Sequence, residues 1–387
     1  MSYLRVGIIP HSRFHSTPNA NQQLGFDIRL GPPYIAPMVR ILYGVHGTGH
    51  GHAMRALTVA RHYPEHEFLF VSHGHGAEIL GGEFRVEEYP NPETPVSGHE
   101  VDTIRAAQSQ FRIWANQPRL MRNLTRLIET FKPDAALTDY EYLVPRACRK
   151  VGLPCLSFDH QHVVTMAQHQ LPPGQALSYW ATYGAIRFLF TRADYYLVTS
   201  FYRPPLRPKV SCRLVPPLLR NRILDYRPNT GEYVLAYHGY ETFPGFFEFL
   251  KTIPRRVIVY GSHKNDNDGN LEFKKNSENG FLDDLAGCGY VVCGGGHTLI
   301  SEALYLQKPL IVFPIRSAFE QFLNAHYVSQ LGYGLGMSGL HAPPDTAAKF
   351  EARVEKYRNA VTRENFCGND DIYQVLDRFI DGRELPA

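Results

Sequence analysis

From Val39 onward, short apolar runs alternate with longer stretches in which apolar residues recur at helical spacing. The runs are bounded by Gly, Pro or Asp and are apolar on both faces, which is typical of parallel strands covered by helices. For the first half, this pattern predicts strands at 39–45, 67–72, 134–138, 154–158 and 195–200, and helices near 52–62, 102–131, 142–150 and 175–192.

The alternation stops at residues 216–231, which carry prolines near their start, a further proline at 228 and no clear period, and therefore predict a linker. It then restarts with strands at 232–237, 255–261, 289–295 and 309–315, and helices near 243–252, 279–286, 297–306, 318–331, 344–359 and 369–382. Two successive α/β units predict two doubly wound, Rossmann-like domains facing a cleft. We place the domains at 38–220 and 231–387 with a linker at 221–230, and expect the last helix to pack back on the first domain.

Residues 1–37 do not fit this pattern. They contain Pro, Asn, Gln and Gly without periodicity, and a fresh apolar run begins directly after them. We interpret them as an N-terminal extension outside the fold, with an extra strand at 2–10 as the alternative reading.

Composition narrows the class of protein. The net charge is only +3, so no nucleic-acid partner is indicated, and the apolar content of 44% is enough for two cores. No run approaches the roughly 20 apolar residues that a membrane span needs. The six cysteines form no CxxC pair and show no disulfide spacing, which favours a cytoplasmic protein with reduced thiols.

The first candidate site is the turn GTGHGH at residues 47–52, between the first strand and the first helix. Open α/β sheets bind ligands at the carboxyl ends of their strands, and glycines there allow close approach. A histidine at a helix N-terminus is favoured in its neutral form and can accept a proton near neutral pH. His50 and His52 are therefore candidates for a general base. Capping or packing roles and a metal site are the alternatives, although no further ligand cluster has obvious spacing.

The second candidate site follows the strand ending at Cys293. Gly294, Gly295 and Gly296 precede a predicted helix that starts near His297, and the free N–H groups of such a helix start form an anion site. About one turn into the helix lies Glu302, a carboxylate that could accept two ribose hydroxyls. Glu320 and Gln321 follow the strand 309–315, and their side chains suit sugar hydroxyls.

This second stretch resembles the donor-binding motif of GT-B glycosyltransferases of families 1 and 28. These families include the peptidoglycan lipid-intermediate GlcNAc transferase, the galactolipid synthases and the UDP-glycosyltransferases. The first turn is similar as well, with Gly51 and His52 on the Gly-His of the family pattern. The second motif matches over about 30 residues, at Gly295, Gly296, Ser301, Glu302, Pro309, Pro314, Glu320, Gln321, Asn324 and Ala325.

The resemblance implies roles for individual residues on the acceptor side. His52 falls on the candidate base of the family. Asp139 lies where some family 1 enzymes keep an Asp that pairs with that histidine, and its alternative role is an N-cap for the next helix. His160 and His162, in the segment 158–162, lie where polar residues face the acceptor, with packing as the alternative.

On the donor side, the resemblance places His297 near the diphosphate, with packing at the helix start as the alternative. Phe281 is expected to contact uracil, with packing against the helix as the alternative. The triplet Asp266–Asp268 resembles the DxD motif of metal-dependent transferases, but it lies in a Gly- and Asn-rich loop that predicts a solvated turn. No metal and no cofactor are therefore expected, and the UDP-sugar is the donor substrate.

Together these features imply an inverting, metal-independent transfer of a sugar from a UDP-sugar to an acceptor hydroxyl. Lipid and cell-envelope glycans are candidate acceptors, because segments 111–132 and 178–192 carry Arg and aromatic residues of the kind that dock on anionic membranes. Core-facing aromatics with solvated arginines are the alternative there. The alternative functions are a non-hydrolysing UDP-GlcNAc 2-epimerase and a nucleotide-binding protein without catalysis.

Overall fold

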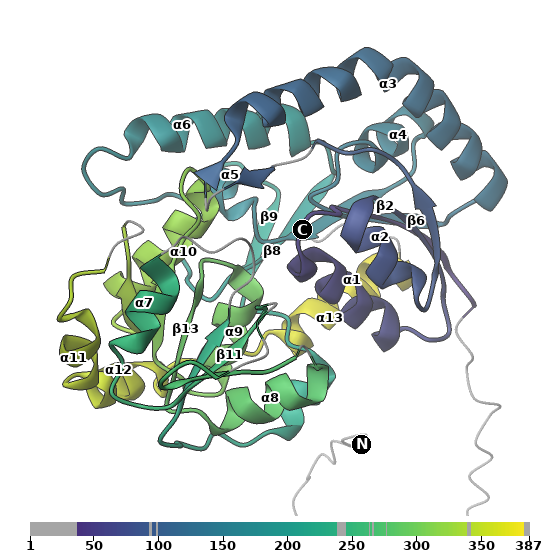
Figure 1. Cartoon of the computed structure of the whole chain (residues 1–387). Coiled ribbons are helices and arrows are strands. Elements are labelled where there is room, and N and C mark those ends of the chain that lie inside the picture. Colours follow the sequence, from purple (N-terminus) through teal and green to yellow (C-terminus); the bar gives the residue numbers. More distant parts are fainter. Residues whose placement is uncertain are drawn as a thin grey trace, which may run out of the picture. The chain divides into compact units, whose positions relative to one another are not determined.

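The first of two sheets carries the carboxyl ends of the strands that lead into the first candidate site. The computed structural model describes residues 37–92, 95–97, 100–237, 245–262, 264, 267–275, 277–338 and 342–382. In this model the sheet has seven parallel strands in the order β3-β2-β1-β6-β7-β8-β9 (Figure 1). Apart from Pro37, the predicted N-terminal extension lies outside the described residues. The strands are β1 (Arg40–Val45), β2 (Glu67–Ser72), β3 (Arg85–Glu88), β6 (Ala135–Asp139), β7 (Cys155–Asp159), β8 (Tyr195–Thr199) and β9 (Cys212–Val215).

Helices cover both faces of this sheet, and the strand order reverses beside β1, between β1 and β6. Ligands of open α/β sheets bind at such a switch point. The helices are α1 (His50–His62), α2 (Gly74–Gly81), α3 (Thr103–Phe131), α4 (Val144–Val151), α5 (Val163–Met166) and α6 (Ala176–Ala185), which continues as a π-helical turn over Ile186–Phe190. A short hairpin of β4 (Val96–Ser97) and β5 (Glu100–Val101) precedes α3.

The second sheet has six parallel strands in the order β12-β11-β10-β13-β14-β15. Its strands are β10 (Val234–Tyr237), β11 (Val257–Tyr260), β12 (Leu271–Phe273), β13 (Tyr290–Gly294), β14 (Leu310–Phe313) and β15 (Gly334–Gly336). Its helices are α7 (Gly245–Lys251), α8 (Glu278–Gly287), α9 (His297–Tyr305), α10 (Phe319–Gln330), α11 (Thr346–Glu351) and α12 (Val354–Val361). The prediction of two doubly wound α/β units is thereby confirmed.

The sequence prediction missed the strands at the sheet edges and several short elements, namely α2, α5 and the hairpin of β4 and β5. Strands β3, β9, β12 and β15 were not predicted, because the prediction recognises only runs that are apolar on both faces. The edge strand β3 reads RVEE, with both ends exposed, since no neighbouring strand covers its outer side. The helix predicted at 344–359 is divided into α11 and α12 at Ala352 and Arg353.

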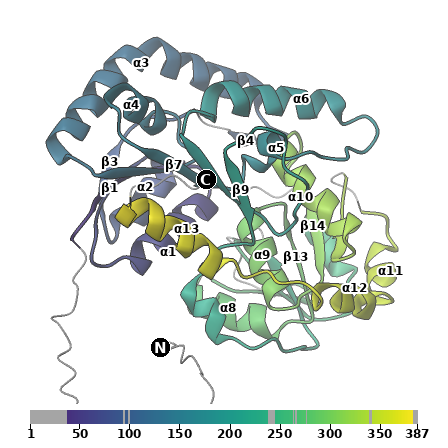
Figure 2. The same cartoon turned by 180° about the vertical axis from the view of Figure 1, so that it is seen from behind.

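The final helix, α13 (Asn369–Gly382), packs on the first sheet although it follows the second in sequence (Figure 2). Its buried residues Ile372, Leu376 and Phe379 share a core with Ile41 and Tyr43 of β1. The helix is amphipathic, and burial of its apolar stripe holds this C-terminal helix against the first sheet.

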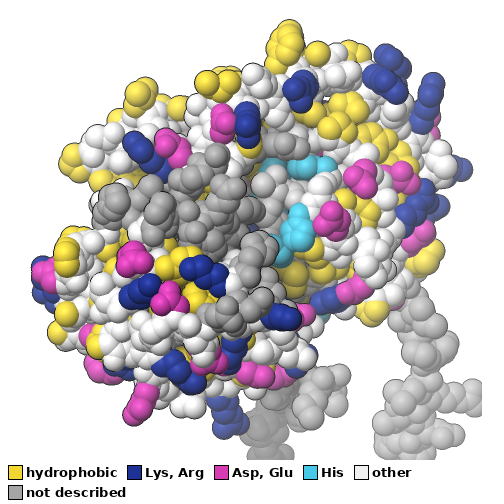
Figure 3. Space-filling view, viewed as in Figure 1, with side chains coloured by type: hydrophobic (Ala, Val, Ile, Leu, Met, Phe, Trp, Pro, Cys, Tyr) yellow, Lys and Arg dark blue, Asp and Glu magenta, His cyan; other side chains and the backbone are white. Residues whose placement is uncertain are grey.

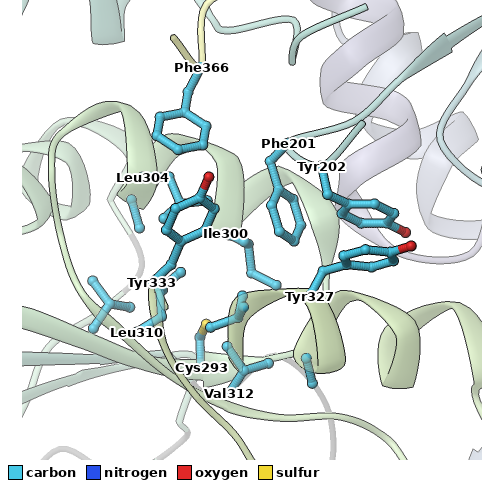
Figure 4. Packing of buried hydrophobic residues seen from close by; sticks show 14 of the residues in the cluster. Phe201, Tyr202, Cys293, Ile300, Leu304, Leu310, Val312, Tyr327, Tyr333 and Phe366 are labelled. Atoms are coloured by element: carbon cyan, nitrogen blue, oxygen red, sulfur yellow. The ribbon is translucent and has the colours of Figure 1, made fainter. Parts of the chain in front are cut away.

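Another core extends from β8 in the first half into the second sheet. Tyr202, in the segment after β8, stacks on Tyr327 of α10 with ring centroids 3.9 Å apart. Figure 4 shows these two rings face to face, with Phe201 beside them. Burial of aromatic surface here fixes the loops that follow β7 and β8 against α9 and α10.

All six cysteines are free thiols. Among the described residues, no helix combines the length and the apolar character needed to cross a bilayer.

Candidate active site

The first glycine turn, residues 47–52, brings His52 to Asp139. Strands β1 and β6 are neighbours, with Val45 opposite Asp139, so both strands end beside the start of α1. His52 is buried, and its Nδ1 lies 2.7 Å from Asp139 Oδ1. A carboxylate only accepts hydrogen bonds, so Nδ1 carries a hydrogen, and in the neutral ring Nε2 is the acceptor. The amide nitrogen of Gln161 lies 3.3 Å from that Nε2, in agreement with its role as acceptor.

Arg55 completes this group and was not predicted from the sequence. Its Nε donates to Asp139 Oδ2 at 2.7 Å, and a terminal nitrogen donates to Oδ1 at 2.8 Å. Burial opposes the charge of the guanidinium, but the attraction and hydrogen bonds of Asp139 outweigh it and raise the pKa of Arg55. The bidentate pair fixes the carboxylate in the orientation that His52 needs. One signal in the sequence could have indicated Arg55: it lies three positions after His52, and residues three apart lie on the same face of a helix.

The alternative role of Asp139, as a helix cap, is taken by another residue. Glu141 accepts hydrogen bonds from the backbone N–H groups of Leu143 and Val144, at 2.8 and 2.6 Å, at the start of α4. Burial raises the pKa of Glu141 to about 7. Between the two acids, Tyr140 adopts a left-handed backbone with φ 53°. Such strain in a non-glycine residue is typical of functional sites and here turns the chain between the two carboxylates.

His50 has different surroundings from His52. It is exposed, and its Nε2 lies 2.8 Å from Nε2 of the half-exposed His75. Burial, followed by repulsion from His75, lowers the pKa of His50. The described residues contain no group of three or more His, Cys, Asp or Glu arranged to hold a metal ion. Of the two histidines in the turn, only His52 is paired with a carboxylate.

Two further histidines, His46 and His73, surround His52. The His46 ring lies 5.2 Å from His52 and 5.3 Å from His73, and all three are buried. Burial, followed by repulsion between the rings, lowers the pKa of His46 well below its ordinary value and that of His73 to about 4. His46 and His73 are therefore uncharged near neutral pH.

We expect this cluster to make the protein sensitive to acid. His73 has a folded-state pKa of about 4 against an ordinary 6.5, so the unfolded chain binds the proton first as the pH falls. The stability that the neutral ring contributes is present above pH 6.5 and is lost as the pH falls toward 4. The shift corresponds to about 3 kcal/mol of unfolding free energy. Urea unfolding at several pH values should show a weaker pH dependence for His73→Phe than for the unsubstituted protein. An identical dependence would contradict the assignment.

The second glycine turn, Gly294–Gly296, joins β13 to α9. A Cβ on Gly295 would lie 2.6 Å from Cβ of Gln321 and 2.8 Å from its carbonyl oxygen, so only glycine fits there. Gly296 is the N-cap of α9, and a Cβ there would meet nothing within 4 Å. A helix start whose cap residue carries no side chain suits an anion. His297, the first residue of the helix, is buried, and burial followed by repulsion from His160 and Arg55 lowers its pKa well below the ordinary value.

The two glycine turns lie against each other. A Cβ on Gly51 would lie 2.9 Å from Oγ1 of Thr298 in α9. Across the same junction, the rings of His160 and His297 stack with centroids 3.9 Å apart. Figure 3 shows histidine side chains gathered near the middle of one face of the molecule. One site can thus contain both the imidazole of His52 and the start of α9.

The remaining donor-side candidates already have protein partners. Both oxygens of Glu302 accept from Arg220, at 2.7 and 2.8 Å, and Gln321 Oε1 accepts from the backbone of Ile315 at 3.1 Å. A carboxylate bound by one guanidinium retains lone pairs for further donors. Arg220, from the predicted 38–220 domain, is a second residue that the sequence analysis missed.

Two other sequence candidates are placed as follows. Phe281 packs edge-on against Tyr237 and Tyr260, with centroids 5.6 and 5.3 Å apart, in agreement with its packing role. Of the DxD-like triplet, Asp266 lies outside the described residues, and Asp268 pairs with Lys251 at 3.0 Å.

Sequence comparison identifies similar proteins. A family model described as glycosyl transferase family 1 matches residues 39–355. The chain is 26% identical over 375 residues to an uncharacterised glycosyltransferase of Methanosarcina acetivorans, covering 89% of this chain and 93% of that protein.

Comparison with solved structures gives the same class. UGT2 of Phytolacca americana, complexed with UDP-2-fluoro-glucose and pterostilbene, matches with a TM-score of 0.61 and 14% identity over 91% of this chain and 98% of that one. The glycosyltransferase VinC in complex with dTDP matches with a TM-score of 0.60 and 16% identity over 89% of this chain and 100% of that one. At these identities the likeness concerns the fold, and the GT-B architecture implied by the sequence motifs is confirmed.

Proposed function

The chain belongs to glycosyl transferase family 1, and on that premise we propose that it transfers a sugar from a UDP-sugar to an acceptor hydroxyl with inversion. One observation carries this proposal. An imidazole whose Nδ1 is held by a buried Asp–Arg pair, leaving Nε2 as the acceptor of the neutral ring, adjoins the N-terminus of α9 across the two glycine turns. A proton acceptor beside an anion site is what such a transfer requires.

In the proposed reaction, His52 Nε2 takes the proton of the acceptor hydroxyl. The acceptor oxygen then forms a bond to the anomeric carbon while the bond from that carbon to the diphosphate oxygen breaks. The bonding electrons leave with UDP. The resulting imidazolium is stabilised by Asp139, whose second oxygen remains paired with Arg55.

In this proposal the diphosphate lies beside the N-terminus of α9, where negative charge develops on it during the reaction. The cap residue Gly296 carries no side chain, and the first turn of the helix holds no acidic residue that would repel an anion. Oriented N–H groups and the helix dipole stabilise such charge without reorganisation. For this reason the proposal includes no metal ion. Glu320 and Gln321, at the start of α10, are the proposed partners of the sugar hydroxyls.

The choice of UDP rests on the sequence resemblance, and the similar structures contain UDP-2-fluoro-glucose in one case and dTDP in another. Thermal unfolding with UDP, dTDP and GDP separates these nucleotides, since a ligand that binds only the folded state raises the melting temperature. The proposal expects the largest increase with UDP. A larger increase with GDP would contradict the nucleotide assignment, and no increase with any of the three would contradict the proposed donor site.

The epimerase alternative predicts a different product. Incubating the protein with UDP-GlcNAc and no acceptor should leave the sugar configuration unchanged in an NMR spectrum if the protein is a transferase. An epimerised sugar would overturn the proposal in favour of the epimerase.

For the acceptor, we propose a lipid-linked hydroxyl reached at a membrane surface. Helices α3 and α6 both run along the top of the molecule in Figures 1 and 2. An open, mostly apolar pocket of about 540 Å³ lies along the start of α3. Just before this helix, β5 contacts the second half, where Val101 N–H donates to the carbonyl of Arg316. Exposed apolar side chains of this surface are Ile104, Phe111, Trp114, Leu177, Trp180 and Phe188, and exposed arginines of α3 are Arg105, Arg112, Arg119, Arg122 and Arg126.

Such a surface should bind anionic bilayers by combining apolar insertion with charge attraction. We expect the protein to sediment with phosphatidylglycerol vesicles and not with phosphatidylcholine vesicles. Replacing Arg112 and Arg119 with Gln should weaken this binding about 30-fold. Equal binding to both kinds of vesicle, or none to either, would contradict the membrane proposal without affecting the donor site.

A further inference from the structure

His160, which follows β7, lies where the two halves of the chain meet. The side chain is fully buried, and both ring nitrogens have close partners. Nδ1 lies 2.8 Å from the carbonyl oxygen of Thr199, at the end of β8. Nε2 lies 2.9 Å from Oδ1 of Asn324 and 3.3 Å from a carboxylate oxygen of Glu320, both on α10.

The partners of Asn324 determine which of its side-chain atoms faces His160. Its Nδ2 lies 2.9 Å from the carbonyl oxygen of Gly295 and 2.6 Å from Glu320 Oε1. Each of these oxygens accepts, so the atom between them is the donating nitrogen. A reversed amide would set its oxygen against two other oxygens. Oδ1 of Asn324 therefore points at His160 and can only accept.

His160 thus faces acceptors on both sides. The carbonyl of Thr199 accepts from Nδ1, and Oδ1 of Asn324 accepts from Nε2, so each ring nitrogen must supply a hydrogen. A neutral imidazole has one N–H group, and only the imidazolium has two. The neighbouring carboxylate of Glu320 is the counter-ion, with a side chain that is only 19% exposed.

The other neighbours agree with a charge at this position. His297 of α9 stacks on the ring at 3.9 Å, and Tyr202 contacts it edge-on at 5.8 Å. Ser301 Oγ donates to the carbonyl of His297 at 2.8 Å, so at 3.3 Å it accepts from Nε2 of His297. Because burial and the charges of its neighbours lower the pKa of His297, that ring is neutral, and the stacked pair holds one positive charge.

We propose that His160 is held as an imidazolium that positions Glu320 and Asn324 for the donor sugar. This inference rests on the proposed function for the identity of the ligand. The chain of contacts runs from Thr199 in the first half through His160 and Asn324 to Gly295. Glu320 lies at the end of the same network. The positive charge of His160 holds its carboxylate in one orientation toward the sugar hydroxyls. His160 is a positioning residue, since its nitrogens are occupied by protein groups.

The protonation of His160 can be measured without donor or turnover. Neutron diffraction from the unsubstituted protein, crystallised at about pH 8, where free imidazole is neutral, should show hydrogen isotope on both ring nitrogens. Nitrogen-15 NMR of the histidine side chains, assigned by the signals lost in His160→Gln, should show an N–H group on both nitrogens of one residue. A bare nitrogen on His160 would overturn the inference.

The positioning role has its own readout. His160→Gln keeps a donor but removes the charge, so we expect the KM for the UDP-sugar to rise about tenfold while the Kd for UDP changes less than about twofold. A mere loss of packing would weaken both ligands alike, and that result, or an unchanged KM, would overturn the positioning role. If the protein transfers no sugar at all, the proposed function fails, whereas the diffraction result still decides the state of His160.

Discussion

Replacing His52 with Ala is expected to lower the rate of sugar transfer about 100- to 10,000-fold, the range typical of a lost general base. The affinity for UDP should change less than about twofold, because the proposed diphosphate contacts lie at the N-terminus of α9. The physical reason is that Nε2 of His52 is the proposed proton acceptor, while its other nitrogen is fixed 2.7 Å from Asp139. Initial-rate assays, with UDP titration by calorimetry, measure the two quantities separately.

The matched control for this variant is His50→Ala. His50 is two residues away in the same glycine turn, but its partner is His75 and no carboxylate orients it. Its removal should change the transfer rate less than about threefold. If His50→Ala abolishes transfer while His52→Ala retains it, the base has been assigned to the wrong histidine.

Replacing Asp139 with Asn is expected to cost both activity and stability. An amide can face His52 with a donor as well as an acceptor, so the tautomer is no longer fixed, and in a comparable triad this change lowers the rate about 10,000-fold. At the same time Arg55 loses its counter-ion in a buried position. Breaking a buried pair in this way costs about 3–5 kcal/mol of unfolding free energy.

A double variant separates the two effects. Combining Asp139→Asn with Arg55→Met removes the unpaired guanidinium, so most of the lost unfolding free energy should return in urea titrations. The transfer rate should stay low, because His52 still lacks its carboxylate. Recovery of the rate together with stability would mean that Asp139 acts only through the fold.

Most of the fold could be predicted because the central strands are buried on both faces. A parallel strand covered by helices must be apolar throughout, and this leaves a pattern that is visible in β1, β6 and β13. The edge strands could not be found in the same way, since one side of each has no neighbouring strand. Strand β15, reading GLG, carries almost no side-chain signal.

The candidate site could be predicted where its residues lie in a sequence motif. His52, Gly295 and Glu320 belong to stretches whose spacing resembles a known family, and the structure brings their segments together. Arg55 carried no such signal, because an arginine on an amphipathic helix is usually solvated. Only the packing of α1 beside the end of β6 gives it the partner Asp139.

The role of His160 could not be predicted for a related reason. Its partner Asn324 is 164 positions away in the sequence, and the hydrogen-bond pattern that requires two N–H groups exists only when the halves are packed. The sequence placed His160 near the acceptor, with packing as the alternative. The structure instead joins it to the donor-side helix α10.

The central claim is that the two glycine turns form a single site, in which the first supplies the base and the second binds the nucleotide sugar. A crystal structure of the protein with UDP tests this most directly. The account predicts diphosphate oxygens about 3 Å from the backbone N–H groups at Gly296 and His297, on the side that faces His52. A diphosphate bound away from the start of α9, or on a face of that helix that His52 cannot reach, would contradict it.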